Sequence, residues 1–129
     1  MASGELEQTL TGYGNAYLIT IGADIRPHAI EVRAELDSHR FLVTDAGNST
    51  RRNIGDRNTV TLLWPPLEPG GYTLLVDGLA TLTDRGIEIV VTRAVQHRAA
   101  TENSQNVNAC GSDCHPLPVT AQPGSFQME

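Results

Sequence analysis

The residues best suited to bind a ligand lie in one polar segment, residues 48–53, between two apolar runs. Ser49 and Thr50 carry hydroxyls that can bond phosphate oxygens. The next two residues, Arg51 and Arg52, can add charge-assisted hydrogen bonds. Backbone N–H groups at a helix start and the helix dipole also favour an anion. The segment therefore predicts either a phosphate site or a capped surface helix with solvated arginines, since short polar helix starts are common.

A second group of reactive side chains lies near the end of the chain, where Cys110, Cys114 and His115 occur within six residues. A closed zinc site needs four ligands, and this Cys-x-x-x-Cys spacing has no matching second half. Another histidine could complete a site only if the fold brought it close: His28, His39 or His97. We therefore assign no metal. Two free thiols and a reversible disulfide remain the alternatives.

Size and charge restrict the class of protein. The chain has 129 residues, 40% of them hydrophobic, and a net charge of -6, which fits one globular domain and disfavours a nucleic-acid binder. Glu5 and Glu7 interrupt the first residues, so no secretory signal is visible. No apolar run approaches the roughly 20 residues that a membrane span needs. We expect a cytoplasmic protein without nucleic-acid or membrane partners.

The apolar pattern from residue 16 onward has the period of two that is typical of strands. It is clearest in residues 28–36, where the even-numbered residues from Ile30 to Leu36 are apolar. Gly78, inside a long alternating run, predicts a bulge. Asn48 or Ser49 is the expected N-cap of one short helix. The predicted strands are residues 16–21, 28–36, 40–44, 59–64, 72–83 and 87–92, with that helix at 48–56 between strands 3 and 4.

This pattern predicts a mainly β protein, a six-stranded antiparallel split β-barrel. Residues 1–15 would form a short helix or an ordered arm. The barrel domain would occupy residues 1–99. From about residue 100 the composition becomes rich in Asn, Ser, Gln and Pro, so we expect residues 100–129 to form a polar C-terminal tail that wraps a partner or stays disordered.

The order strand, polar helix start, strand resembles the FMN-binding split-barrel family typified by pyridoxamine 5′-phosphate oxidase. The match covers residues 16–99. It rests on Arg26-Pro27-His28, on Leu42-Val43-Thr44 followed by Gly47-Asn48-Ser49, and on Arg52-Asn53-Ile54 leading into the strand that ends at Trp64. The run LWPPLEPGGY, residues 63–72, resembles a small actinobacterial-type branch whose reactions are mostly unassigned.

The resemblance implies a homodimer with the cofactor at the subunit interface. It implies that the cofactor phosphate is held by the second strand, the third strand and the helix start. The usual pattern has two basic residues where Ser49 and Thr50 stand, and here the charge moves to Arg51 and Arg52. Carried onto this chain, the candidate cofactor-binding residues are His28, Arg33, Thr44, Asn48, Ser49, Thr50, Arg51, Arg52 and Trp64.

Two of these candidates carry a geometric alternative. His28 and Arg33 have opposite parity, so an unbroken strand cannot direct both at one ligand, and either a bulge intervenes or only one binds. Trp64 would pack on a cofactor ring or, more commonly for a single tryptophan, in the core or an interface.

The resemblance implies a protein that binds a flavin-type cofactor, FMN or a deazaflavin, and that would be an oxidoreductase if it is an enzyme. No residue stands out as a general acid or base, and the substrate is unknown. The alternative is a non-catalytic carrier or sensor of flavin or haem with the same fold. A third interpretation is a barrel that has lost its cofactor and keeps only the dimer.

Overall fold

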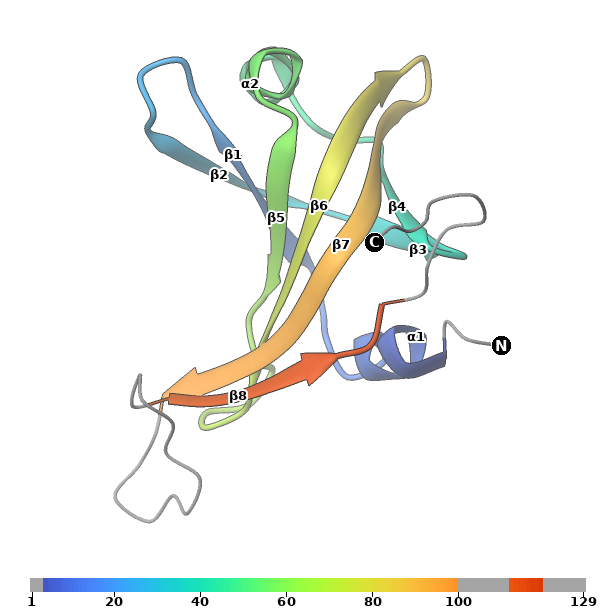
Figure 1. The fold of residues 1–129 in the computed structure, drawn as a ribbon, viewed down its shortest axis with the longest axis vertical. Helices are drawn as coiled ribbons and strands as arrows, with labels where there is room; N and C mark the ends of the chain where they lie inside the picture. Colours follow the sequence, from blue (N-terminus) through green and yellow to red (C-terminus); the bar gives the residue numbers. More distant parts are fainter. Residues whose placement is uncertain (1–3, 100–111, 120–129) are drawn as a thin grey trace.

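A computed structural model describes residues 4–99 and 112–119. Two helices and eight strands follow one another within these residues (Figure 1). In chain order they are α1 (Gly4–Leu10), β1 (Ala16–Ile21), β2 (Pro27–Val32), β3 (Ala34–Asp37), β4 (Arg40–Val43), α2 (Asn48–Asp56), β5 (Thr59–Trp64), β6 (Thr73–Thr83), β7 (Gly86–Ala99) and β8 (Ser112–Leu117).

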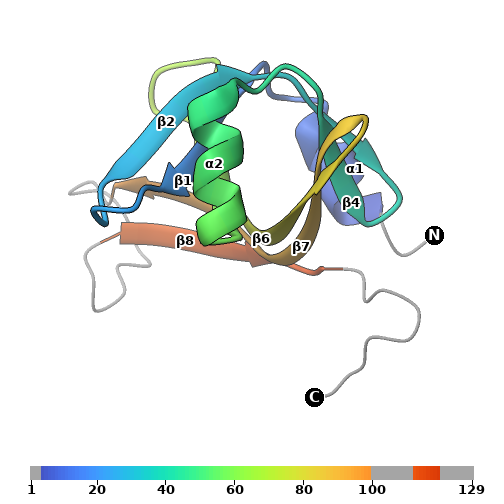
Figure 2. The same ribbon diagram turned by 90° about the horizontal axis from the view of Figure 1, so that it is seen from above.

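The strands form one antiparallel sheet in the order β2-β1-β5-β6-β7-β4-β3, with β8 added to β7. The sheet curls into a half-barrel, and α2 lies across it near one end, in contact with β1 and β6 (Figure 2). No helix in the described part of the chain is long and apolar enough to cross a membrane.

The core lies inside the curl because alternate residues of each strand point there. In β1, for example, Ala16, Leu18 and Thr20 are each 0% exposed while the residues between them are more accessible. Burial of one large apolar side chain stabilises the fold by about 1.5–3 kcal/mol. The largest fully buried apolar side chains are Phe41, Leu18, Leu62, Leu74, Ile87, Ile89, Val32, Val43, Val60 and Val76.

The mainly β, antiparallel class is confirmed, but the count of six strands is wrong. The predicted strand over residues 28–36 divides at Arg33 into β2, which pairs with β1, and β3, which pairs with β4. The predicted last strand is longer than expected and continues to Ala99 in β7. Residues 112–117, expected to belong to a tail, pair with it as β8. Two further tail residues, Pro118 and Val119, follow β8, and residues 100–111 and 120–129 lie outside the described residues.

The helix start also differs from the expected one. Gly47, with extended backbone, is the N-cap of α2 and makes no side-chain cap hydrogen bond. Neither Asn48 nor Ser49 caps the helix, because both are already helical residues. The first N–H groups of α2 therefore have no side-chain acceptor at the cap position.

The bulge predicted at Gly78 is confirmed by a register shift between Asp77 and Gly78 where β6 pairs with β7. A Cβ added to Gly78 would lie 2.5 Å from Ile89 Cγ2 and 2.6 Å from the Val90 carbonyl oxygen. β6 and β7 thus approach each other more closely than any other side chain would permit.

We expect Gly78→Ala to destabilise the protein by about 1–3 kcal/mol, because the added methyl group overpacks the bulge. Denaturant unfolding would measure the change. Gly55→Ala is the matched control, since nothing lies within 4 Å of a Cβ at this exposed position in α2. It should stabilise the protein by about 0.5–1 kcal/mol. A stabilising effect at Gly78 would contradict the close approach.

Candidate functional site

A surface cleft of about 340 Å³ lies between α2 and the hairpin that joins β1 to β2. Figure 1 shows these two elements side by side at one end of the sheet, in agreement with their contact. The hairpin is closed by hydrogen bonds from Gly22 N to Arg26 O (2.9 Å) and from Ile25 N to Gly22 O (2.9 Å). The lining residues are Gly22, Ala23, Asp24, Arg26, Pro27, His28, Ser49, Arg52 and Asn53.

A buried hydrogen bond fixes the rotation of α2 on the sheet. The buried residues of the helix, Thr50, Asn53 and Ile54, have the spacing of one helical face. The Asn53 Nδ2 group donates to Thr20 Oγ1 of β1 at 3.0 Å, in a position closed to solvent. This bond ties the side of α2 that carries Asn53 to the strand beside the cleft.

The rotation separates the two neighbouring arginines. Successive residues of an α-helix are turned by about 100°. Arg52 and Ser49 lie on the side of α2 that lines the cleft, whereas Arg51 does not line it. Of these two guanidiniums, that of Arg52 is therefore the one that a ligand in this cleft can reach.

The charges of the hairpin nearly cancel each other. Arg26 Nε lies 3.1 Å from Asp24 Oδ2 in an exposed ion pair. The Asp24 carboxylate also accepts a hydrogen bond from the Arg26 backbone N–H, at 3.3 Å. With this pair balanced, Arg52 is the other arginine among the lining residues.

His28 brings a polar atom without a hydrogen-bond partner to the same place. Its Nδ1 is buried and has no partner among the described residues. His28 lies directly opposite Thr20 where β1 pairs with β2, so the two side chains share the face of the sheet that α2 covers. Because buried polar atoms are normally satisfied, this nitrogen is suited to contact a ligand atom.

Of the nine predicted binding residues, the structure brings His28, Ser49 and Arg52 together in the cleft. Arg33 is exposed at the break between β2 and β3, in a run whose accessibility alternates from residue 28 to residue 36. Of these two residues, His28 therefore shares the face that α2 covers and Arg33 does not, and that only one of them binds a ligand stays a prediction.

The other predicted residues do not line the cleft. Thr50 is 1% exposed, and its Oγ1 is buried without a partner among the described residues. Trp64 is 3% exposed and packs in the core on Phe41, with ring centroids 5.3 Å apart. Thr44 and Asn48 are exposed but do not line the cleft, and Arg51 is half-buried outside it.

Sequence reasoning missed the contribution of the hairpin. The binding residues predicted from the sequence include none of the hairpin before His28, although Asp24 and Arg26 line the cleft. The signal in the sequence is an acidic and a basic residue two positions apart in a turn, Asp24 and Arg26, just before the candidate His28. Their distance from α2 along the chain concealed the contact.

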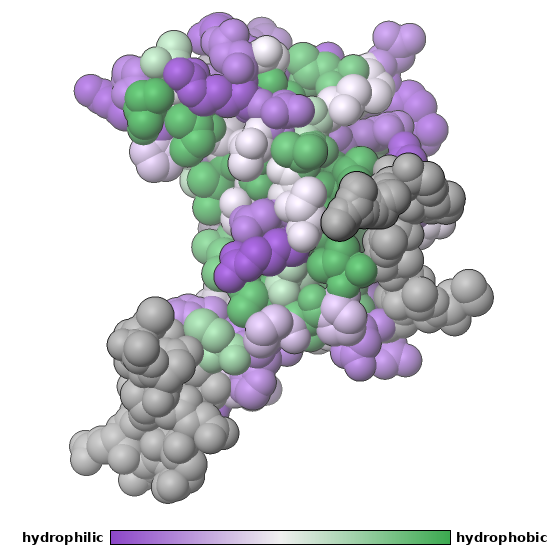
Figure 3. Space-filling model, in the orientation of Figure 1, coloured by the Kyte–Doolittle hydropathy of each residue, from purple (hydrophilic) through white to green (hydrophobic). Residues whose placement is uncertain are grey.

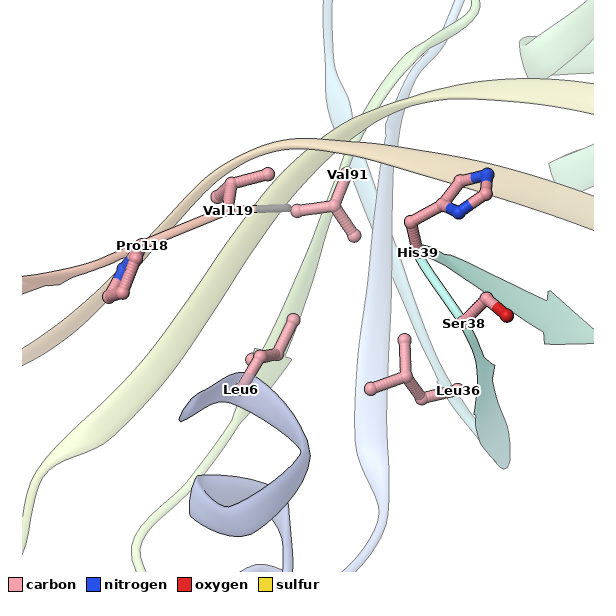
Figure 4. Close-up of a pocket in the computed structure, with 7 residues that line it drawn as sticks. All are labelled: Leu6, Leu36, Ser38, His39, Val91, Pro118 and Val119. Atoms are coloured by element: carbon pink, nitrogen blue, oxygen red, sulfur yellow. The ribbon is translucent and has the colours of Figure 1, made fainter. Parts of the chain in front are cut away.

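A second, much smaller cavity lies between α1, β3 and the segment that follows β8 (Figure 4). Its volume is about 10 Å³, room for at most one water molecule. The side chains around it are mainly apolar, so it is a small packing gap at the end of the core rather than a ligand site. Its lining residues are Leu6, Leu36, Ser38, His39, Val91, Pro118 and Val119.

Comparison with solved structures agrees with a split-barrel fold. An F420 reductase superimposes with a TM-score of 0.57 at 17% identity, over 68% of this chain and 94% of that chain. HupZ of Group A Streptococcus superimposes with a TM-score of 0.58 at 17% identity, over 79% of this chain and 94% of that one. At this identity the likeness concerns the fold alone.

Sequence comparison supplies the family. No family model matches the chain. Two uncharacterized proteins, Mb0449c of Mycobacterium bovis and MT0457 of Mycobacterium tuberculosis, are each 37% identical to it over 126 residues. The alignments cover 84% of this chain and 89% of each relative. The chain belongs to the same family as these two mycobacterial proteins.

We expect Asn53→Ala to destabilise the protein by about 1–3 kcal/mol, because it leaves the fully buried Thr20 hydroxyl without its amide. Denaturant unfolding would measure the loss. Ser49→Ala, on the exposed surface of the same helix, is the control and should change stability by about 0.5 kcal/mol or less. Equal effects of the two substitutions would show that the Asn53 bond does not hold α2.

Proposed function

We propose that this protein binds a flavin-type cofactor, with the cofactor phosphate in the cleft between α2 and the β1–β2 hairpin. The observation that carries the proposal is the convergence of His28, Ser49 and Arg52 on that cleft. These residues come from the second strand and the helix start, two of the three elements to which the family resemblance assigns the phosphate. A hydroxyl, a guanidinium and an imidazole are all suited to phosphate oxygens.

The cleft fits such a group in size and chemistry. Its volume of about 340 Å³ lies within the roughly 300–1,000 Å³ range of small-molecule sites. The buried Nδ1 of His28 has no partner among the described residues and would gain one from a phosphate oxygen or hydroxyl. Ion pairing with Arg26 reduces the repulsion that the Asp24 carboxylate would exert on an anion.

The charge of the phosphate group itself favours the phosphodiester of a deazaflavin over the phosphomonoester of FMN. A phosphate monoester such as that of FMN carries about -1.5 to -2 charges at pH 7, whereas the phosphodiester of a deazaflavin cofactor carries one. Arg52 supplies one positive charge that is not balanced within the lining of the cleft. The fold likeness to an F420 reductase, a protein named for a deazaflavin, is consistent with this choice.

A bound flavin or deazaflavin would supply hydride-transfer chemistry, which makes the protein an oxidoreductase if it acts on a substrate. The residues of this chain would anchor and orient the cofactor. A carrier that binds flavin or haem without catalysis is the alternative that the fold also allows.

We further propose that the protein is a homodimer, because an apolar row crosses the outer face of the sheet. The register aligns Tyr17 with Leu63 and Leu63 with Leu75, whereas Val95, the partner of Leu75 in β7, is only 5% exposed and adds little open surface. Tyr17 is 39% exposed although it lies within a strand. Over β5 to β7, Figure 3 shows apolar surface on this molecule interrupted by a polar patch. In a monomer this row would be exposed to water, whereas a second copy of the chain would cover it.

The adjacent row on the same face is polar and already satisfied. Thr61 Oγ1 donates to Asp77 Oδ1 at 2.7 Å, and Arg93 NH1 lies 3.1 Å from Asp77 Oδ2. An apolar row beside a hydrogen-bonded polar one matches the core and rim of a protein interface.

The two adjacent arginines test the cofactor site. Arg52→Gln should weaken binding of F420 or FMN by about 10- to 150-fold, the range expected for loss of a charged hydrogen bond. Arg51→Gln removes the same charge one residue away, outside the cleft, and should change the affinity by about threefold or less. Fluorescence titration of each cofactor would measure both.

Equal effects of these substitutions would place the phosphate elsewhere. A wild-type protein that binds neither F420 nor FMN would refute the cofactor proposal. If that protein instead binds haem, with the corresponding visible absorption, the carrier alternative would replace it.

Tyr17→Glu should weaken the dimer by about 100-fold or more, because it would bury a carboxylate in the apolar row. Analytical ultracentrifugation over a range of concentrations would measure the change. Leu67→Glu, at a loop residue that is 69% exposed, is the control and should leave the dimer intact. A monomeric wild-type protein, or a Tyr17→Glu dimer of unchanged affinity, would contradict this interface.

A further inference from the structure

The tip of the β1–β2 hairpin contains a strained residue. The backbone hydrogen bonds that close the hairpin define a turn over residues 23–25 whose last residue adopts a left-handed backbone. That residue is Ile25, with a φ of 66°. A β-branched side chain is disfavoured in this conformation, and Ile25 is 65% exposed, so no core packing offsets the strain. Such strain persists where the surrounding structure holds it, and it is concentrated at ligand sites.

The strained turn holds an acidic side chain against a basic one. Asp24 and Arg26 flank Ile25, and both line the cleft. Asp24 Oδ1 accepts a hydrogen bond from the Arg26 backbone N–H at 3.3 Å, and Asp24 Oδ2 lies 3.1 Å from Arg26 Nε. A Cβ added to Gly22 would lie 3.3 Å from Asp24 Oδ1, so the carboxylate also lies close to the backbone at the base of the hairpin. These contacts hold the Asp24 carboxylate within the lining of the cleft.

This carboxylate sets the charge that the cleft offers to an anion. The carboxylates and guanidiniums among the lining residues are those of Asp24, Arg26 and Arg52. Because Asp24 neutralises Arg26, the guanidinium of Arg26 is already paired when a phosphate arrives. Arg57 donates to the Gly22 carbonyl at 3.4 Å but does not line the cleft. A second negative charge on the phosphate would therefore meet a carboxylate instead of an unpaired cation.

We propose that Asp24 is a specificity-determining residue, which makes the cleft favour a singly charged phosphodiester over a doubly charged phosphomonoester. This inference rests on the proposed cofactor-phosphate site and names the residue that sets its charge preference. A monoester carries about -1.5 to -2 charges at pH 7, whereas a diester carries one. Repulsion between like charges is a common means by which a site excludes a similar but unwanted ligand.

A purely structural role of the same pair predicts a different result. If the pair only supports the strained turn, loss of either partner would disturb the cleft in the same direction. If the pair sets the charge, the two losses act in opposite directions. Replacement of Asp24 adds one positive charge to the lining, whereas replacement of Arg26 removes one. The sign of the change in ligand preference therefore separates the two roles.

The test compares two phosphate groups on the same ring. The ligands are FMN and riboflavin 4′,5′-cyclic phosphate, together with the corresponding two phosphates of 5-deazariboflavin. Fluorescence titration of the full chain gives the ratio of monoester to diester affinity for the ring that the wild-type protein binds more tightly. Asp24→Asn, which retains an oxygen for the Arg26 backbone N–H, should raise this ratio about three- to tenfold. Arg26→Gln should lower it by a similar factor.

The double variant Asp24→Asn/Arg26→Gln restores the net charge of the lining, and its ratio should return to within about twofold of the wild-type value. Asp56→Asn is the matched control, since Asp56 is an exposed acidic residue of α2 that does not line the cleft. It should change the ratio by less than about twofold.

An unchanged ratio after Asp24→Asn, or an equal change after Asp56→Asn, would overturn the role of Asp24. Changes of the same sign after Asp24→Asn and Arg26→Gln would assign the pair to structure alone and overturn it as well. In each of these cases, weaker binding by Arg52→Gln would still support the cofactor site. A wild-type protein that binds neither ring with either phosphate would instead refute the cofactor site, and the inference with it.

Discussion

The hydrogen bond between Asn53 and Thr20 determines which side chains meet at the cleft. It lies in a position closed to solvent. There, an amide left without its partner would lower the stability of the folded protein by about 1–3 kcal/mol. The helix therefore has one preferred rotation on β1, and that rotation directs Arg52 and Ser49 towards the hairpin. A rotation of about one residue would place Arg51 there and expose Ile54 to water. The buried bond between Asn53 and Thr20 thus determines which arginine of α2 lines the surface cleft.

The curl of the sheet depends on two local departures from regular pairing. At Arg33 the chain changes partner from β1 to β4, so one continuous run of alternating residues spans both edges of the sheet. At Gly78 a bulge bends β6 against β7, and bulges are a common means of increasing twist. Together they close the sheet around its core while leaving its convex face open. The apolar row from Tyr17 to Leu75 lies on that convex face.

Sequence patterning could predict most strands because inward and outward residues alternate with a period of two. It could not reveal the division at Arg33, since accessibility continues to alternate through residue 33 without interruption. β8 was also missed, because residues 112–117 are polar, contain Pro116, and gain their strand conformation from pairing with β7. For the candidate site, the parity of His28 and Arg33 was informative. Helix rotation and the hairpin contact depend on tertiary packing and have no local signal.

Charge limits how the cleft can attract its ligand. The chain carries a net charge of -6, so an anion approaching from a distance meets a repulsive field. At physiological ionic strength this field is screened beyond about 8 Å, and local charges then decide the outcome. Among the residues that line the cleft, Arg26 compensates Asp24 at 3.1 Å and leaves the exposed Arg52 as the attractive charge. A phosphate group with one negative charge therefore gains most of the attraction available in the cleft, while a second charge on that group would have to be stabilised by neutral donors such as Ser49.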